Sequence, residues 1–272
     1  MRAALVQLCS GDDPAANLPE TEALIRDAAR QGADLILTPE CTNIVSADRA
    51  QQRAVLAEEA EDATLARLRS VAGALGCWLV IGSLLLKAGD GDPRFVNRSF
   101  VIAPDGTIRA RYDKIHLFDV TLADGESYRE SAAIRPGDRA VTVAAAGWRL
   151  GLSICYDLRF PQLYRDLARA GARILTVPSA FTVPTGAAHW EVLLRARAVE
   201  TGCFVLAPAQ TGLHATRAGR ARRTYGHSLA VAPSGEVLAD AGEAIGITLV
   251  EIGGGEAMPP MRDRSRISGT SR

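Results

Sequence analysis

The chain has 272 residues, of which 47% are hydrophobic and 23% are charged, an ordinary composition for a globular protein long enough to form one large domain. Lysine plus arginine and aspartate plus glutamate each number 31, so the formal net charge is zero. This balance argues against a nucleic-acid partner, which usually requires a basic excess. No apolar run approaches the roughly 20 residues that span a bilayer, so we expect no membrane association.

The N-terminus and the cysteines both favour a cytoplasmic protein. The apolar run at Met1–Leu8 is too short for a signal peptide, and Asp12 and Asp13 follow it closely. The cysteines are odd in number and widely spaced, which favours reduced thiols over a disulfide framework. They are Cys9, Cys41, Cys77, Cys155 and Cys203.

Short apolar runs alternate with helical stretches along the whole chain, which predicts an α/β fold. The predicted strands are residues 3–9, 34–38, 77–85, 95–103, 149–155, 173–178, 203–207, 225–232 and 245–252. The predicted helices are residues 15–31, 50–75, 162–170 and 187–201. Turn sequences at 89–92, 104–106 and 233–235 predict tight connections between strands. Continuous apolar strands indicate sheets that are covered on both faces.

The most informative local pattern is a strand that ends on Cys155 and leads through a short turn to Pro161, the start of a predicted helix. Backbone N–H groups at such a helix entrance stabilise negative charge, so the pattern predicts a lowered thiol pKa and a reactive thiolate. A lone cysteine in this position is more often a small buried residue, because free cysteine is among the most buried residue types.

Two further strand ends carry charged residues. Glu40 follows the apolar strand at 34–38 after one proline, and Lys114 lies among the aromatic, apolar and charged residues at 111–117. Each charge taken alone is more often solvated on a loop. Only the combination of Glu40, Lys114 and Cys155 indicates a catalytic site.

With these three motifs the chain resembles the nitrilase superfamily of carbon–nitrogen hydrolases, from Met1 to about Arg264. The matching segments are residues 39–40, 113–118, 154–161, 188–200 and 225–228. Within the superfamily it is most similar to the deaminated glutathione amidases, through residues 178–181, 189–200, 208–210 and 225–228. The resemblance implies a four-layer αββα sandwich in one domain over residues 1–264, with a C-terminal tail at 265–272. It also implies a homodimer or a higher homo-oligomer.

The resemblance carries the family's catalytic triad onto Glu40, Lys114 and Cys155. Cys155 would attack the amide carbon and form a thioester, while Glu40 would act as general base. Lys114 would stabilise the oxyanion together with the backbone N–H of Tyr156.

Glu130 matches a second family glutamate that positions Lys114 or the nucleophile. Glu126 lies four residues upstream in the same polar loop, so the choice between the two stays open at this point. An exposed loop carboxylate is the alternative interpretation of Glu130.

Substrate binding is less well specified by the sequence. The resemblance places Tyr156, Arg159 and Phe181 beside the substrate, and arginine can bind a carboxylate through paired hydrogen bonds. A further arginine cluster could do the same or could be a solvated loop. It consists of Arg217, Arg220, Arg222 and Arg223.

The resemblance implies an amidase that cleaves the C–N bond of a small carboxylated amide, such as deaminated glutathione, without a cofactor or metal. The alternatives are an ω-amidase acting on 2-oxo acid amides, an N-carbamoyl amino acid hydrolase, a nitrilase, or a non-catalytic binding protein on the same fold. No zinc or calcium motif is present, and none of the four histidines lies in the local signature of papain-like Cys/His enzymes.

Overall fold

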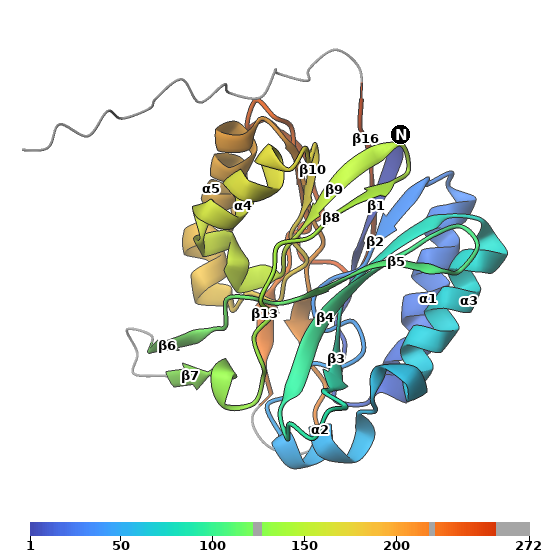
Figure 1. Cartoon of the computed structure of the whole chain (residues 1–272), viewed down its shortest axis with the longest axis vertical. Coiled ribbons are helices and arrows are strands. Elements are labelled where there is room, and N and C mark those ends of the chain that lie inside the picture. Colours follow the sequence, from blue (N-terminus) through green and yellow to red (C-terminus); the bar gives the residue numbers. More distant parts are fainter. Residues whose placement is uncertain (122–126, 218–220, 254–272) are drawn as a thin grey trace, which may run out of the picture.

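The computed structural model describes residues 1–121, 127–217 and 221–253. Within these ranges two six-stranded sheets face each other in the centre of the molecule, with two helices on the outer side of each sheet (Figure 1). The helices are α1 (Pro14–Arg30) and α3 (Ala63–Leu75) on one side, and α4 (Pro161–Arg169) and α5 (Val183–Thr201) on the other. This layering confirms the αββα sandwich that the resemblance implied.

The first sheet has the strand order β16-β1-β2-β3-β4-β5. Its three central strands are parallel, since β1 pairs with β2 and β2 pairs with β3 in parallel. The strands on both sides of them pair in antiparallel orientation. The strands are β1 (Arg2–Gln7), β2 (Leu35–Leu37), β3 (Trp78–Lys87), β4 (Phe95–Ile102), β5 (Ile108–Asp113) and β16 (Gly246–Glu251).

The second sheet repeats this plan with the order β15-β14-β11-β10-β9-β8. Parallel pairs join β9, β10 and β11, and antiparallel strands flank them. The strands are β8 (Thr142–Ala145), β9 (Trp148–Leu152), β10 (Ile174–Thr176), β11 (Phe204–Ala207), β14 (Leu229–Val231) and β15 (Val237–Asp240). Two small ribbons lie outside the sheets, β6 (Asp119–Thr121) with β7 (Ser127–Arg129) and β12 (Thr211–Leu213) with β13 (Arg223–Tyr225).

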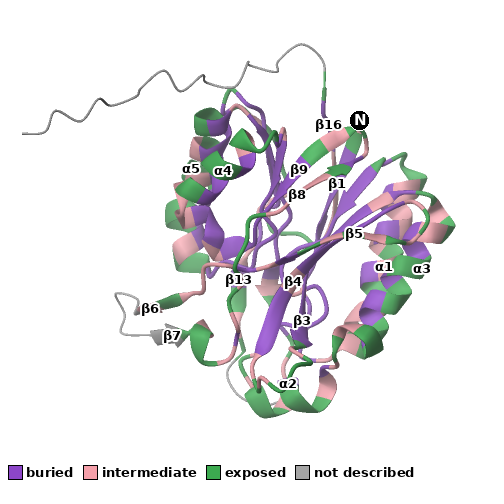
Figure 2. Cartoon of the chain, in the orientation of Figure 1, coloured by how far each residue is buried: buried purple, intermediate pink, exposed green. Residues whose placement is uncertain are grey.

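The central strands are buried on both faces, which explains their continuous apolar sequences (Figure 2). In β1, Ala3 and Leu5 pack in the cluster that includes the second sheet, whereas Ala4 and Val6 pack toward α1 and α3. Successive side chains of a strand point to opposite faces, so one short strand contributes to two cores. The sheets therefore form a rigid centre from which the connecting loops project.

The single helix predicted at residues 50–75 is wrong. The segment forms α2 (Arg49–Val55), the 3-10 turn η1 (Glu59–Glu61) and α3. Asp48 caps the start of α2, and Asp62 caps α3 by accepting a hydrogen bond from Leu65 N at 2.7 Å. Carboxylates are favoured as N-caps, because they satisfy N–H groups that have no partner within the helix. The apolar periodicity continues through these caps, so it concealed the break.

The strand predicted at residues 225–232 is also two strands, β13 and β14. Gly226 and His227 between them both have positive φ, 76° and 57°, which a continuous strand does not permit. Edge strands such as β5 and β8 were not predicted correctly, because their alternating exposed residues resemble loop composition.

The two sheets approach each other closely beside Glu40. A Cβ atom on Gly82 of β3 would lie 2.0 Å from Thr38 O and 2.5 Å from Pro178 Cβ, so only glycine fits. The register of β3 against β4 shifts at this point, between Ile81 and Leu84. The loops after β2 and β10 are thereby brought into contact across the sandwich.

Two sequence-based expectations concern the chain as a whole. No helix within the described ranges combines the length and the apolar composition needed to cross a bilayer. The tail predicted at residues 265–272 lies outside the described residues.

Candidate active site

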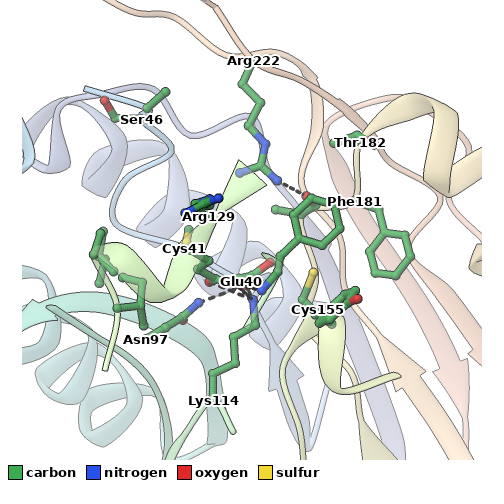
Figure 3. Close-up of a pocket in the computed structure, with 18 of the residues that line it drawn as sticks. Glu40, Cys41, Ser46, Asn97, Lys114, Arg129, Cys155, Phe181, Thr182 and Arg222 are labelled. Atoms are coloured by element: carbon green, nitrogen blue, oxygen red, sulfur yellow. Dashed lines mark hydrogen bonds and ion pairs between the residues drawn. The ribbon is translucent and has the colours of Figure 1, made fainter. Parts of the chain in front are cut away.

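Three ionisable side chains meet where strands of both sheets end. Glu40 follows β2, Lys114 follows β5, and Cys155 follows β9, and all three are buried, with exposed fractions of 4%, 2% and 8%. Lys114 Nζ donates a hydrogen bond to Glu40 Oε1 at 2.9 Å, and the Cys155 side chain lines the same cavity as both. Figure 3 shows Glu40 between Lys114 and Cys155. The three predicted residues thus form one cluster.

Cys155 sits on a strained turn that exposes its side chain to the cluster. Its φ is 50°, in the left-handed region that non-glycine residues rarely occupy. The turn is held by the Cys155 N–H, which donates to Pro178 O at 2.9 Å, and by the Ile154 N–H, which donates to Asp157 Oδ2 at 2.8 Å. Strain of this kind persists only where the surroundings fix the backbone, and it is concentrated at functional sites.

Opposing effects set the charge of Glu40. Burial raises the pKa of the Glu40 carboxyl, but the Lys114 ammonium and hydrogen bonds from Cys155 and Lys114 outweigh burial and bring the pKa below its ordinary value. For Lys114, burial favours the neutral amine, yet Glu130 and Glu40 hold the pKa well above its ordinary value. Glu40 is therefore a carboxylate and Lys114 an ammonium at neutral pH.

The lowered thiol pKa expected for Cys155 is wrong. Burial, reinforced by the negative charge of Glu40, raises the pKa of the Cys155 thiol well above its ordinary value, and Lys114 offsets this only in part. The residues that follow Cys155 form a short 3-10 turn, η3 (Cys155–Arg159), and not the start of a long helix. The resting group is thus a thiol, whereas the neighbouring Glu40 carboxyl is ionised.

Glu130 belongs to this cluster and is not an exposed loop carboxylate. Both of its carboxylate oxygens lie 3.0 Å from Lys114 Nζ, and Glu130 Oε2 also accepts a hydrogen bond from Phe118 N at 2.6 Å. The residue begins the 3-10 turn η2 (Glu130–Ala132). Glu126, the alternative in the same loop, lies outside the described residues.

Two amide side chains that the sequence did not single out hold Glu40. Asn97 Nδ2 donates a hydrogen bond to Glu40 Oε1 at 3.0 Å, and the backbone carbonyl of Asn97 accepts a hydrogen bond from the backbone N–H of Lys114. Gln210 Nε2 donates to the Glu40 carbonyl at 3.1 Å. Asn97 comes from β4 of the first sheet, whereas Gln210 follows β11 of the second, so both sheets fix the base.

Asp157 is a third residue that the sequence did not identify. Its fully buried carboxylate accepts four hydrogen bonds at 2.6–3.0 Å. Three of the donors lie in the segment around Lys114, namely Tyr112 OH and the backbone and ring N–H groups of His116, and the fourth is Ile154 N beside the nucleophile. One carboxylate therefore fixes the Lys114 segment relative to Cys155.

We expect Asp157→Asn to lower kcat by about 10- to 100-fold with little change in KM, because a misplaced nucleophile affects the transition state more than substrate binding. The asparagine side chain keeps the volume of the aspartate, but one of its two polar atoms is an amide nitrogen that cannot accept hydrogen bonds from the donors around Asp157. Steady-state kinetics on the purified variant measure this, with Tyr112→Phe as a milder control that removes one donor. Reduced thermal stability with unchanged kcat would contradict a positioning role.

The cluster lies at the base of a cavity of about 240 Å³. Tyr156, Arg159 and Phe181, the predicted substrate-binding residues, all line it. The Tyr156 N–H lies in the first turn of η3, where backbone N–H groups have no acceptor within the helix, so it is available to an oxyanion. The remaining lining residues mix apolar and basic side chains. They include Leu85, Phe118, Ile134, Arg49, Arg129 and Arg222.

The predicted arginine cluster is divided by the structure. Arg222 lines the cavity and donates to Ala180 O. Arg217 instead pairs with Asp13, and Arg223 is an exposed residue of β13 that is not among the lining residues. Arg220 lies outside the described residues.

Histidines are absent from the lining of this cavity, as far as the described ranges extend. Burial lowers the pKa of His214 to about 4, so its ring is neutral. The four histidine side chains have other partners: His116 with Asp157, His189 with Arg159, His214 with Ser10 and Thr224, and His227 with Asp240. A carboxylate, and not an imidazole, therefore lies beside the thiol.

Comparison with known proteins agrees with this geometry. The model of the carbon-nitrogen hydrolase family matches residues 2–255. A deaminated glutathione amidase from Synechocystis is 42% identical over 252 residues, which are 92% of this chain and 90% of that protein. The solved structure of Caenorhabditis elegans NitFhit superimposes with a TM-score of 0.83 at 35% identity, over 92% of this chain and 60% of that one.

A solved structure of a Nesterenkonia amidase variant is similar with a TM-score of 0.79 at 30% identity, over 93% of each chain. It contains acrylamide added at the active-site cysteine of that enzyme. The family match over nearly the whole chain and the full-length relatives decide the classification. The chain belongs to the carbon-nitrogen hydrolase family and is a hydrolase acting on carbon–nitrogen bonds other than peptide bonds.

Proposed function

We propose that this enzyme is an amidase that cleaves a small carboxylated amide of the deaminated glutathione type through a thioester on Cys155. The observation that carries the proposal is the buried contact of a protonated thiol with an ionised Glu40 and a Lys114 ammonium at the base of a cavity. The names of the full-length relatives support the substrate class.

In the first half-reaction, Glu40 takes the thiol proton as Cys155 Sγ bonds to the amide carbon. The carbonyl oxygen becomes an oxyanion that Lys114 Nζ and the Tyr156 N–H stabilise. The tetrahedral intermediate then collapses, the C–N bond breaks, and the departing amine receives the proton from Glu40. The acyl group remains on Cys155 as a thioester.

In the second half-reaction, Glu40 takes a proton from water, and the resulting hydroxide adds to the thioester carbon. Lys114 again stabilises the oxyanion. The thiolate leaves and recovers its proton from Glu40, which releases the carboxylic acid. Glu130 and Asn97 keep Lys114 and Glu40 in place throughout, because they contact these groups directly.

The arginines at the cavity support an anionic substrate. Arg159 lies beside the nucleophile turn, with its guanidinium carbon 5.7 Å from the Tyr156 ring centre and 6.0 Å from that of Phe181. A guanidinium held over aromatic rings is oriented to bind a carboxylate. We assign Arg159 to the carboxylate on the acyl portion of the substrate, which stays near Cys155.

A substrate panel tests the proposal. We expect release of the acyl product from deaminated glutathione with a higher kcat/KM than from 2-oxoglutaramate, N-carbamoyl amino acids or nitriles. Intact-protein mass spectrometry of a quenched reaction should detect the acyl group on Cys155. A kcat/KM for 2-oxoglutaramate equal to or above that for deaminated glutathione would favour an ω-amidase, and no turnover of any substrate would favour a binding protein.

We also propose a cytoplasmic homodimer built from one domain over residues 1–264. All five cysteines are free thiols, as expected in a reducing compartment. The outer face of α5 leaves Val192 and Val199 61% and 52% exposed, which a second copy would cover. The molecular mass in solution tests the assembly, and a monomer at micromolar concentration would contradict it.

A further inference from the structure

The rim of the cavity carries four arginines, and none of them pairs with a carboxylate within the described ranges. They are Arg49, Arg129, Arg159 and Arg222. Elsewhere arginines are commonly neutralised, as in the pairing of Arg98 with two carboxylates. The lysine and two glutamates of the catalytic cluster sum to one negative charge, so the arginines leave the cavity positive. Unpaired positive charge around a cavity attracts anions.

Two of these arginines lie on the wall formed by the 3-10 turn η2. Arg129 directly precedes the turn, and Arg49 Nη1 donates to Ala132 O within it at 3.0 Å. Neither guanidinium has a further side-chain hydrogen bond in the described part of the chain. Arg129 and Arg49 therefore share one wall, while most of their N–H groups stay free for a ligand.

The other two arginines lie near Tyr156 and Phe181. Arg159 ends η3 and faces the Tyr156 and Phe181 rings, and Arg222 donates to Ala180 O next to Phe181. Their wall is continuous with the nucleophile turn. The cavity thus has one basic wall beside Cys155 and a second basic wall beside Glu130.

The proton path relates these walls to the two halves of an amide substrate. The acyl half stays on Cys155, whereas the amine half leaves with the proton carried by Glu40. In the view of Figure 3, Glu40 lies between Cys155 on one side and Arg129 on the other. Arg49 contacts Ala132 of η2, the turn that Arg129 directly precedes. The amine half therefore extends toward Arg49 and Arg129.

We propose that Arg49 and Arg129 form a binding site for a carboxylate on the amine half of the substrate. The inference rests on the proposed amidase function and specifies its leaving group, an amine that carries a carboxylate, such as the C-terminal part of a dipeptide. Two guanidiniums can bind one carboxylate through several charge-assisted hydrogen bonds. Deaminated glutathione, with one carboxylate on each side of the cleaved amide, matches both basic walls.

Two substrates that differ in one group test the site. The first is deaminated glutathione, and the second is the same molecule ending in ethanolamine instead of glycine, so that a hydroxymethyl group replaces the carboxylate. Release of the acyl product, 2-oxoglutarate, is measured for both. We expect the wild-type enzyme to favour the first in kcat/KM by about 10- to 100-fold, as is typical for charge-assisted hydrogen bonds.

The variants Arg49→Gln and Arg129→Gln should each lower kcat/KM for deaminated glutathione by about 10-fold or more. Their kcat/KM for the ethanolamine analogue should stay within about 2-fold of the wild-type value, because the analogue lacks the carboxylate. Arg159→Gln should lower kcat/KM equally for both substrates, since both keep the carboxylate on the acyl half. The matched control is Arg53→Gln, which removes the same charge from an exposed position one turn along α2 and outside the cavity lining.

Equal losses on the two substrates in Arg49→Gln and Arg129→Gln would overturn the carboxylate site while leaving the amidase function intact. A wild-type enzyme that cleaves both substrates equally well would overturn it too. Failure of the wild-type enzyme to release 2-oxoglutarate from either substrate would instead contradict the proposed function. The two failures are therefore distinguishable.

Discussion

Replacing Cys155 with alanine should lower amidase turnover by at least about 10⁴-fold, because in the proposed mechanism the residue is the nucleophile of the first half-reaction and carries the acyl group into the second, and loss of a nucleophile usually has effects of this size. The change removes one sulfur from a buried position, so the fold should persist. Substrate should still bind, since the cavity arginines are untouched. Product release measures turnover, and isothermal titration calorimetry measures binding to the inactive variant.

Cys203→Ala is the matched control. Cys203 is also buried, at 0% exposure, and its thiol donates to Ala172 O at 3.3 Å, away from the cavity. We expect this variant to keep its kcat and its thioester intermediate. Turnover in Cys155→Ala within about 10-fold of wild type would be incompatible with covalent catalysis by this thiol.

Replacing Lys114 with methionine should lower kcat by about 10²- to 10³-fold, the usual cost of losing one oxyanion donor. The substitution has a second consequence for the base. Without the ammonium, burial and the negative charge of Glu130 raise the pKa of Glu40. In the proposed mechanism Glu40 acts as an ionised base. A higher pKa of Glu40 therefore means that activity is lost at a higher pH as the solution is acidified.

In the wild-type enzyme the pKa of Glu40 lies below its ordinary value. In a plot of kcat/KM against pH, the decline on the acid side (the acid limb) should therefore lie at correspondingly low pH. In Lys114→Met this limb should move upward. The chain has one other lysine, the exposed Lys87, so Lys87→Met is a matched control with an unchanged limb. A Lys114→Met variant with near-normal kcat and an unshifted limb would show that the ammonium neither stabilises the oxyanion nor sets the charge of Glu40.

The sequence identified Glu40 and Cys155 because each follows or ends a predicted strand within a family motif, whereas Lys114 was identified by its family motif without a predicted strand before it. The family motifs implied that the three residues share one site. The same reasoning did not identify Asp157 or Asn97. Their importance lies in contacts between segments about 40 to 60 residues apart, which no local pattern records.

The thiol pKa was predicted in the wrong direction for the same reason. A helix entrance near Cys155 suggested a stabilised thiolate, but this local pattern contains no information on burial or on charges from distant segments. Burial between two sheets and the charge of Glu40, which is contributed by the other sheet, decide the ionisation instead. Similarly, apolar periodicity merged α2 and α3, although the carboxylates of Asp48 and Asp62 cap them as separate helices.

By itself the sequence determined the layered α/β fold, the family and the identity of the three clustered side chains, because apolar periodicity and short motifs are local properties of a chain. The tertiary structure alone decided which carboxylate contacts Lys114, the protonation state of Cys155 and which arginines reach the cavity. These depend on distances and burial across two sheets, and both arise only when the sheets pack together.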